Sequence, residues 1–370
     1  MSIFKHSVLL PLLCATWYIF GYSSANPVVH RPSTGSSSYT LETVHQFPNF
    51  TWIENLAIRS TGQIVANDIS NGVIYLVDPA EDPAAASILA EFPSGTSLSG
   101  IVELRPDVFY AQSVDGNVYN FTFVPGSAKL WEIDLRNQVR GALVTKVLDM
   151  PNMKVPNGLS ALPSGRRGQN NPDLLLSADS VAGVVYIIDV INKRYEVVFD
   201  HPLLKPIATA KPPFGVNGVH VVLGDADTDT SMLFFTNTNS GYLGAVPIGK
   251  MDGIPRGTPW LITDEVPAAD DFAVDPDGSF WVTQNIRNTL SHVLPNGIVE
   301  FVAGGVNSTD LLGPVAAAFG RTFDDHANGV LYIGTDGVQT DPVTGKVTRT
   351  AGKIAKIATK TGNGHGWGDW

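Results

Sequence analysis

Polar residues that can bind cations or transfer protons recur along the 370-residue chain, each near the start of an apolar run. The positions are Glu54, Ser99, Asn157, Asn217 and Asp270 with its neighbour Asp271, and a sixth segment that continues the spacing starts around the apolar Ala317-Ala318. Successive positions, counted to Ala318, are 45, 58, 60, 53 and 48 residues apart. Carboxylates and carboxamides supply oxygen ligands for hard cations, and they also act as acids and hydrogen-bond partners. A fold that makes these positions converge would therefore create one oxygen-rich site.

The apolar runs are typical of short β-strands. The clearest segment, 270–283, places the turn Asp-Pro-Asp-Gly between two apolar stretches, a pattern that predicts a hairpin. Six such segments follow one another, and a repeat of roughly 40 to 50 residues with four short strands is typical of a β-propeller blade. The sequence therefore predicts an all-β fold, a six-bladed β-propeller with four-stranded antiparallel blades around a central channel. The starts of the innermost strands would then meet at one mouth of that channel.

The composition also favours an all-β protein. Charged residues make up 16% of the chain and hydrophobic residues 44%, with 36 Gly and 25 Pro, and this combination of low charge and frequent turn formers is unlike a helical or disordered chain. The formal net charge of −11 disfavours nucleic-acid and anionic-membrane partners, which require basic surfaces. The sequence lacks the common motifs for nucleophilic catalysis, zinc binding and nucleotide binding. Because a propeller closes its own sheet edges, we expect a monomer.

The N-terminus has the features of a secretory signal peptide. Lys5 precedes a short apolar run at 8–20, and small residues end at Ala25, so we predict a signal peptide over residues 1–25. An uncleaved membrane anchor is the alternative. Cleavage would remove Cys14, the single cysteine of the chain. Three Asn-x-Thr glycosylation motifs, at Asn49, Asn120 and Asn307, support passage through the secretory pathway. The protein would then be secreted or kept in a vesicular compartment.

The rest of the chain divides into a lead-in, one domain and a tail. Residues 26–39 are rich in turn-forming and small polar residues, which predicts a flexible lead-in. Residues 40–361 are expected to form a single propeller domain, and residues 362–370 a C-terminal tail. The stretch 40–47 alternates polar and apolar residues, so it predicts a strand that closes the ring against the segment 345–357.

Four of the polar positions resemble those of the gluconolactonase/regucalcin family of six-bladed propellers: Glu54, Asn157, Asn217 and Asp270. The resemblance covers most of the mature chain. It implies that Glu54, Asn217 and Asp270 hold one divalent cation, calcium or a similar ion, and that Asn157 contacts the substrate. The fifth segment departs from the family's Asp-Gly, because this chain has Asp-Asp-Phe at 270–272. The departure leaves open which of the two carboxylates occupies the ligand position.

Large apolar residues flank the polar positions, namely Trp52, Leu98, Phe214, Phe272 and Phe319. Some belong to the blade core, but any two that face the channel mouth would make the pocket suit an apolar ligand better than a sugar. The Asn-Gly-Leu/Val segments and the Phe-Gly-Arg-Thr segment at 319–322 resemble a secreted fungal branch of this superfamily. That branch includes the hetero-Diels-Alderases of tropolonic sesquiterpenoid biosynthesis, which join a tropolone o-quinone methide to a humulene-type sesquiterpene. The resemblance implies a pocket that holds both reactants, and from their positions we expect these five residues, together with Glu54 and Ser99, to contact the substrate.

Three functions are compatible with these features. The first is a pericyclase that needs no cofactor, in which Asn157, Asn217 and the aspartate pair at 270–271 hydrogen-bond to the electron-poor reactant. Two carboxyls at close range raise the pKa of one of them, so a protonated member of this pair is reasonable. The second is a lactonase whose cation polarises an ester carbonyl. The third is a secreted propeller that binds a ligand without changing it. The resemblance places the pericyclase first, whereas motif spacing alone favours the metal site.

Overall fold

The structure is a computed structural model that describes residues 39–137, 141–162, 173–225, 228–340 and 346–360. These residues belong to one compact unit, which begins at Ser37. The predicted signal peptide, the lead-in up to residue 38 and the tail lie outside the described residues. Within the described ranges, no helix is long and apolar enough to cross a membrane.

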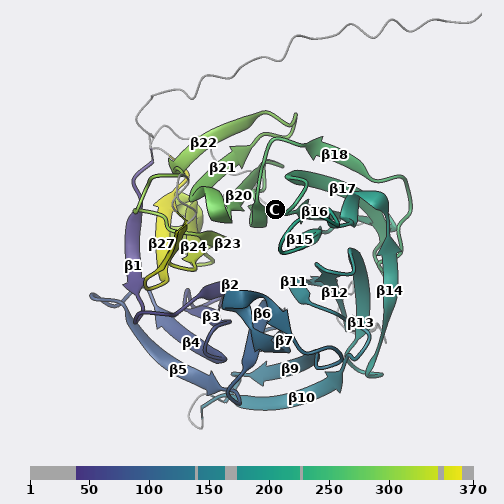
Figure 1. Ribbon diagram of the computed structural model, residues 1–370, viewed down its shortest axis with the longest axis horizontal. Coiled ribbons are helices and arrows are strands. Elements are labelled where there is room, and N and C mark those ends of the chain that lie inside the picture. The colour runs from purple at the N-terminus through teal and green to yellow at the C-terminus, as the bar shows by residue number, and fades with distance from the viewer. Residues whose placement is uncertain (1–38, 138–140, 163–172, 226–227, 341–345, 361–370) are drawn as a thin grey trace, which may run out of the picture. The chain divides into compact units, whose positions relative to one another are not determined.

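Six antiparallel sheets form a ring, which confirms the predicted six-bladed β-propeller (Figure 1). We number the blades by their innermost strands in chain order. Blade 1 contains β2 (Ile53–Ile58), β3 (Ile64–Asp68), β4 (Val73–Asp78) and β5 (Ala85–Glu91). Blade 2 contains β6 (Thr96–Arg105), β7 (Val108–Asn117), β9 (Lys129–Asp134) and β10 (Leu143–Asp149), with the short β8 (Thr122–Phe123) paired to β7. Blade 3 contains β11 (Pro156–Leu162), β12 (Leu174–Asp179), β13 (Val184–Asp189) and β14 (Arg194–Asp200).

The second half of the ring repeats the same order of strands. Blade 4 contains β15 (Val216–Val222), β16 (Thr230–Asn237), β17 (Tyr242–Gly249) and β18 (Trp260–Thr263). Blade 5 contains β19 (Ala269–Val274), β20 (Phe280–Gln284), β21 (Thr289–Val293) and β22 (Val299–Gly304). Blade 6 contains β23 (Pro314–Phe319), β24 (Val330–Thr335), β27 (Lys353–Ala358) and β1 (Glu42–Gln46). The connections contain η1 (Val118–Asn120), η3 (Pro202–Leu204), η4 (Asn285–Arg287), α1 (Phe323–Asn328) and the hairpin β25 (Val338–Thr340)–β26 (Val347–Arg349).

The first strand closes the ring. β1 pairs antiparallel with β27, with Glu42 opposite Lys356 and Gln46 opposite Lys353, as the sequence predicted. Blade 6 therefore combines one strand from the start of the domain with three from its end. Backbone hydrogen bonds between these strands hold the first and last blades together without a covalent link.

All six innermost strands share an irregularity near the channel mouth. Pairing with the second strand shifts register there, so that one or two residues bulge out of the ladder. The first bulged residues are Glu54, Ser99, Asn157, Asn217, Asp270 and Val315. A bulge bends the strand and re-aims its side chains. Five of the six are the polar positions found in the sequence, whereas in the sixth blade the equivalent residue is the apolar Val315 rather than Ala318.

Glycine follows the first bulged residue in blades 2, 3 and 4. A Cβ atom on Gly158 would lie 2.4 Å from the backbone oxygen of Asn217, and one on Gly218 would lie 2.4 Å from Asp271 Oδ1. Innermost strands of neighbouring blades thus approach too closely for a side chain at these positions. The Asn-Gly pairs of this chain at 157–158 and 217–218 consequently lie inside strands, although Asn-Gly is more often a turn.

Candidate functional site

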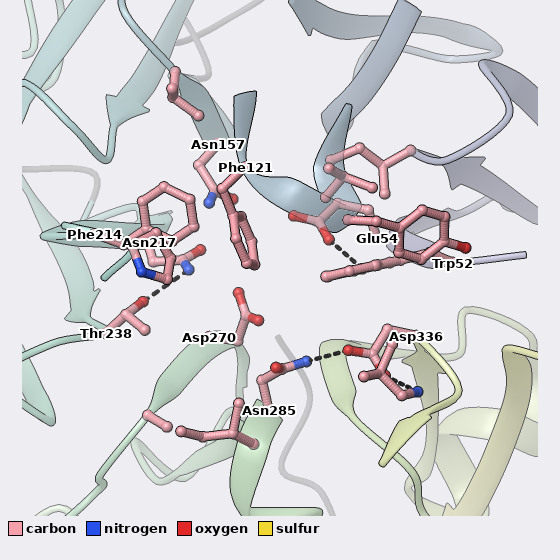
Figure 2. Close-up of a pocket in the computed structure, with 18 of the residues that line it drawn as sticks. Trp52, Glu54, Phe121, Asn157, Phe214, Asn217, Thr238, Asp270, Asn285 and Asp336 are labelled. Atoms are coloured by element: carbon pink, nitrogen blue, oxygen red, sulfur yellow. Dashed lines mark hydrogen bonds between the residues drawn. The ribbon is translucent and has the colours of Figure 1, made fainter. Parts of the chain in front are cut away.

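One mouth of the channel collects two sets of strand ends. The innermost strand of each blade begins there, and the second strand ends there, because the two strands are antiparallel. A cavity of about 690 Å³ opens at this mouth, a volume within the usual range for small-molecule pockets (Figure 2). Its wall is mainly apolar and includes Trp52, Val118, Tyr119, Phe121, Phe214 and Val338. Its floor is polar and carries Glu54, Asn157, Asn217, Asp270, Asn285 and Asp336.

Seven of the residues considered in the sequence line this cavity: Trp52, Glu54, Ser99, Asn157, Phe214, Asn217 and Asp270. The bulges explain the convergence of the five polar residues, because in blades 1 to 5 the first bulged residue of the innermost strand lines the cavity. Four other considered residues are not among the residues that line the cavity, namely Leu98, Asp271, Phe272 and Phe319.

These four side chains lie in blade cores or deeper in the channel. Leu98 is fully buried against strands of blades 1 and 2, and Phe272 is fully buried in blade 5. Both flank a bulge and keep the regular strand alternation, which turns them into the core. Phe319 lies at the opposite end of β23 and packs against the core of blades 5 and 6.

Asp270 and Asp271 are consecutive bulged residues with different surroundings. Asp270 lines the cavity, whereas Asp271 takes part in a hydrogen-bonded bridge with two other blades. Asn55 Nδ2 of blade 1 donates to Asp271 Oδ2 at 2.9 Å, and His220 Nε2 of blade 4 lies 2.8 Å from Asp271 Oδ1. This Asn55–Asp271–His220 bridge connects the adjacent blades 4 and 5 to blade 1, which is a neighbour of neither. Because Asn55 follows Glu54 and Asp271 follows Asp270, the bridge also fixes the two bulges that present floor carboxyls.

The floor carboxyls are Glu54, Asp270 and Asp336, which we call the acid floor. Burial raises the pKa of Glu54 to about 8, with smaller contributions from the charges of Asp336 and Asp271. Trp52 Nε1 donates a hydrogen bond of 2.7 Å to Glu54 Oε2 and partly opposes this rise. Burial also raises the pKa of Asp336 to about 8, and burial together with the charge of Glu54 raises the pKa of Asp270 well above its ordinary value. At neutral pH the acid floor therefore retains protons that exposed carboxyls have lost.

The sequence reasoning did not find Asp336 or Asn285. Asn285 Nδ2 donates to Asp336 Oδ2 at 2.8 Å, and the backbone N–H of Val338 donates to Asp336 Oδ1 at 2.6 Å. Both residues directly follow a second strand, β24 or β20. A repeated polar residue closes or follows most second strands, as in Asp68, Asp179, Asn237, Asn285 and Asp336. Alignment of the strand ends as well as the strand starts would have revealed this second set.

One floor amide has an unsatisfied oxygen. Asn217 Nδ2 donates to Thr238 Oγ1 at 2.9 Å, while Asn217 Oδ1 is buried and has no hydrogen-bond partner. The hydroxyl of Ser99 is likewise buried without a partner. Each buried polar atom without a hydrogen-bond partner lowers the stability of the fold by about 1–3 kcal/mol, unless a bound ligand supplies the missing partner. The Asn217 oxygen can thus accept a hydrogen bond from a ligand or bind a cation, whereas the Ser99 hydroxyl can either donate or accept.

The cavity residues fit in part the divalent cation that the resemblance implies. Glu54, Asn217 and Asp270 all line the cavity and offer the hard oxygen donors that calcium prefers, and the free Asn217 Oδ1 agrees with such a role. Among the described residues, however, no three His, Cys, Asp or Glu side chains form a group that could hold a metal ion. A cation here would therefore rely on Asn217 as much as on the carboxyls.

Two aromatic side chains cover part of the cavity. The rings of Phe121, in the turn before β8, and Phe214, in the loop before β15, meet edge to face with centroids 5.6 Å apart. Figure 2 shows Phe121 projecting between Asn157 and Asp270. Phe121 has a positive φ of 52°, a left-handed conformation that is costly for a bulky residue. Such strain is tolerated where it places a side chain for function.

Comparison with known proteins adds sequence relatives and a fold relative. No protein-family model matches the chain. It is 25% identical over 346 residues, 84% of this chain and 92% of the relative, to a provisionally named hetero-Diels-Alderase of Phoma sp.. It is also 25% identical over 348 residues, 84% of this chain and 82% of the relative, to the provisionally named hetero-Diels-Alderase asR5 of Sarocladium schorii.

The calcium-binding protein regucalcin of Agrobacterium tumefaciens has the same fold, with a TM-score of 0.53, 13% identity, and coverage of 87% of this chain and 96% of that one. At this identity the structural similarity concerns the fold alone. The chain is thus a six-bladed β-propeller, similar in fold to regucalcin and similar in sequence, over most of its length, to proteins named as hetero-Diels-Alderases.

Proposed function

We propose that this protein is a pericyclase, a hetero-Diels-Alderase that joins an electron-poor heterodiene to an alkene in the cavity at the channel mouth. The substrates that fit the sequence resemblance are a tropolone o-quinone methide and a humulene-type sesquiterpene. The observation that carries the proposal is the combination of a mainly apolar wall with a floor of buried carboxyls and amides in one cavity of about 690 Å³. The similarity to two proteins of that name supports the reaction class.

An apolar cavity can accelerate a cycloaddition by holding both reactants in contact. The reaction forms one C–C and one C–O bond, and every atom of the two reactants remains in the product. Because two molecules become one, much of the barrier is entropic, and well-oriented reactants can gain about 7–11 kcal/mol. Phe121, Phe214 and Trp52 offer flat faces on which a conjugated ring can pack.

The floor supplies hydrogen bonds to the heterodiene. Its carbonyl oxygen gains electron density as the alkene attacks, so donors aimed at that oxygen stabilise the transition state. Carboxyls kept neutral by burial, such as Glu54 and Asp336, donate where an ionised carboxylate would repel. The amides of Asn157 and Asn217 complete a polar end that orients the heterodiene.

The test is a direct assay of cycloaddition. An o-quinone methide is released in situ from an ortho-hydroxybenzyl precursor in the presence of humulene, and the adducts are separated by chiral chromatography. We expect a single enantiomer and a faster reaction with the protein than in buffer. Glu54→Gln and Phe214→Ala should each slow the reaction, whereas Lys193→Gln, in an outer turn, should not. A racemic product formed at the buffer rate would reject the proposal.

A lactonase is the second candidate, and the unpaired Asn217 Oδ1 is the observation that favours it. A divalent cation held by Glu54, Asn217 and Asp270 would polarise an ester carbonyl. Metal analysis of the purified protein, with thermal melting before and after chelator treatment, separates the candidates. About one equivalent of bound cation, with a lower melting temperature after chelation, would favour the lactonase. A ligand bound and released unchanged, with neither activity, would instead indicate a binding protein.

We also propose that the protein passes through the secretory pathway. Asn49, Asn120 and Asn307 are all exposed and therefore accessible to glycosylation. Treatment of the secreted protein with an N-glycosidase, followed by mass spectrometry, would test each site, and unmodified asparagine at all three would contradict the proposal.

A further inference from the structure

The acidic and the basic residues that line the cavity lie at different depths. Its acidic residues are the three carboxyls of the acid floor, and none of them is exposed. Its basic residues are Lys211, Arg287 and Arg349, and all three are exposed. We call these three residues the basic rim. A ligand entering the cavity would thus meet positive charge first and neutral acids last.

The basic rim is built from three separate connections around the mouth. Lys211 lies in the loop before β15, Arg287 ends η4, and Arg349 ends β26. Across the described ranges, none of the three forms an ion pair with a carboxylate, although the whole chain carries 35 Asp and Glu against 24 Lys and Arg. In an acidic protein such unpaired cations at one cavity create a local field that attracts anions.

Arg349 is held in position without losing its charge. Its guanidinium carbon lies 4.7 Å from the centre of the Tyr119 ring, and Nη2 donates to the Tyr119 backbone oxygen at 3.2 Å. A stacked arginine that already has fixed geometry loses less entropy when it binds an anion. The rim also exposes apolar side chains, since Ile286 is 66% exposed and Val347 is 46% exposed.

We infer that the basic rim binds the anionic group of an otherwise apolar organic acid, whose body occupies the cavity. The exposed apolar residues beside the cations suit such an amphipathic ligand, because its body and its charge would both be matched. The floor disfavours the opposite orientation, since a full negative charge placed among three buried carboxyls would raise their pKa values further. This binding mode goes beyond the proposed cycloaddition and does not depend on it.

The test compares two fluorescent dyes of similar shape. Anilinonaphthalene sulfonate is anionic, N-phenylnaphthylamine is neutral, and both brighten in apolar sites. We expect the combined Lys211→Gln, Arg287→Gln and Arg349→Gln variant to bind the anionic dye about tenfold more weakly, since exposed ion pairs are worth roughly two- to fivefold each. Binding of the neutral dye should change less than about twofold. Raising the salt concentration should weaken only the anionic dye, and only in the unsubstituted protein.

Two controls make the outcome specific to the rim. Arg349→Lys keeps the charge and should retain most of the affinity for the anionic dye that Arg349→Gln loses. Lys193→Gln removes the same charge from the turn between β13 and β14 and should have no effect. Equal weakening of both dyes would show that the cations do not recognise the negative charge and would overturn the inference. Unchanged binding of the anionic dye in the triple variant, or no binding of either dye to the unsubstituted protein, would overturn it as well.

Discussion

Replacing Glu54 by Gln should make the protein more stable at neutral pH but not at acidic pH. Burial raises the pKa of Glu54 from 4.5 to about 8, so the native state keeps a proton that the unfolded state releases. The stabilisation from this proton is fully present below pH 4.5 and is lost as pH rises toward 8. Its loss amounts to about 1.4 kcal/mol per pH unit, or about 3 kcal/mol between pH 5 and pH 7.

Glutamine is a suitable replacement because it cannot ionise but can still accept the hydrogen bond from Trp52 Nε1. The free energy of unfolding, measured from urea titrations at pH 5, 6, 7 and 8, should be similar in both proteins at pH 5. It should be about 3 kcal/mol higher in the variant at pH 7. Asp270 and Asp336 remain, so some pH dependence persists in the variant.

Glu81→Gln serves as the matched control, because Glu81 lies in an exposed loop of blade 1 and its replacement should leave the pH profile unchanged. If the Glu54 variant and the unsubstituted protein lose stability in parallel from pH 5 to 8, Glu54 is ionised in the native state. The acid floor would then not exist as described, and the hydrogen-bond donation proposed for it would fail.

Other substitutions test the architecture around the site. Asn55→Ala removes a hydrogen-bond donor from the buried Asp271 and should lower the free energy of unfolding by about 2–3 kcal/mol. In a domain of this size, calorimetry should then show a melting temperature about 3–5 °C lower. A shift below 1 °C would show that the bridge contributes little. Gly158→Ala should reduce soluble yield and stability severely, because the new Cβ would lie 2.4 Å from the Asn217 oxygen; a normal melting curve would contradict the close approach of the two strands. Phe121→Gly relieves the positive φ and should raise the free energy of unfolding in urea titrations by up to about 1 kcal/mol. The same substitution should weaken the binding of neutral aromatic dyes severalfold. Unchanged dye binding would show that Phe121 is not part of the site.

The repeat was predictable because its signals are local. Strand alternation and turns such as Asp-Pro-Asp-Gly at 275–278 depend only on nearby residues. Together with the recurrence of Glu54, Asn157 and Asn217 along the chain, they indicated six blades and a common mouth. Alternation predicted the first strand, and the usual closure of a propeller ring predicted that it pairs with a strand near the C-terminus, as it does.

Other features depended on contacts between distant strands. Both Asp270 and Asp271 could occupy the site in sequence, and the β19 bulge decides that Asp270 lines the cavity while Asp271 bonds to Asn55 and His220. The aromatic flanks were equally ambiguous, since Trp52 and Phe214 reach the cavity but Phe272 faces a core. Pattern alone could not separate these cases, because a bulge changes the facing of a side chain without changing its type.

By itself, the sequence determined the fold class, the number of blades and five of the polar positions at the mouth, since periodicity and turn chemistry are encoded within each repeat. Tertiary structure alone decided the composition of the acid floor, because Asp336 joins Glu54 only when the ring closes. It also decided the charge state of these groups, because burial in the assembled cavity, rather than residue type, keeps the carboxyls protonated.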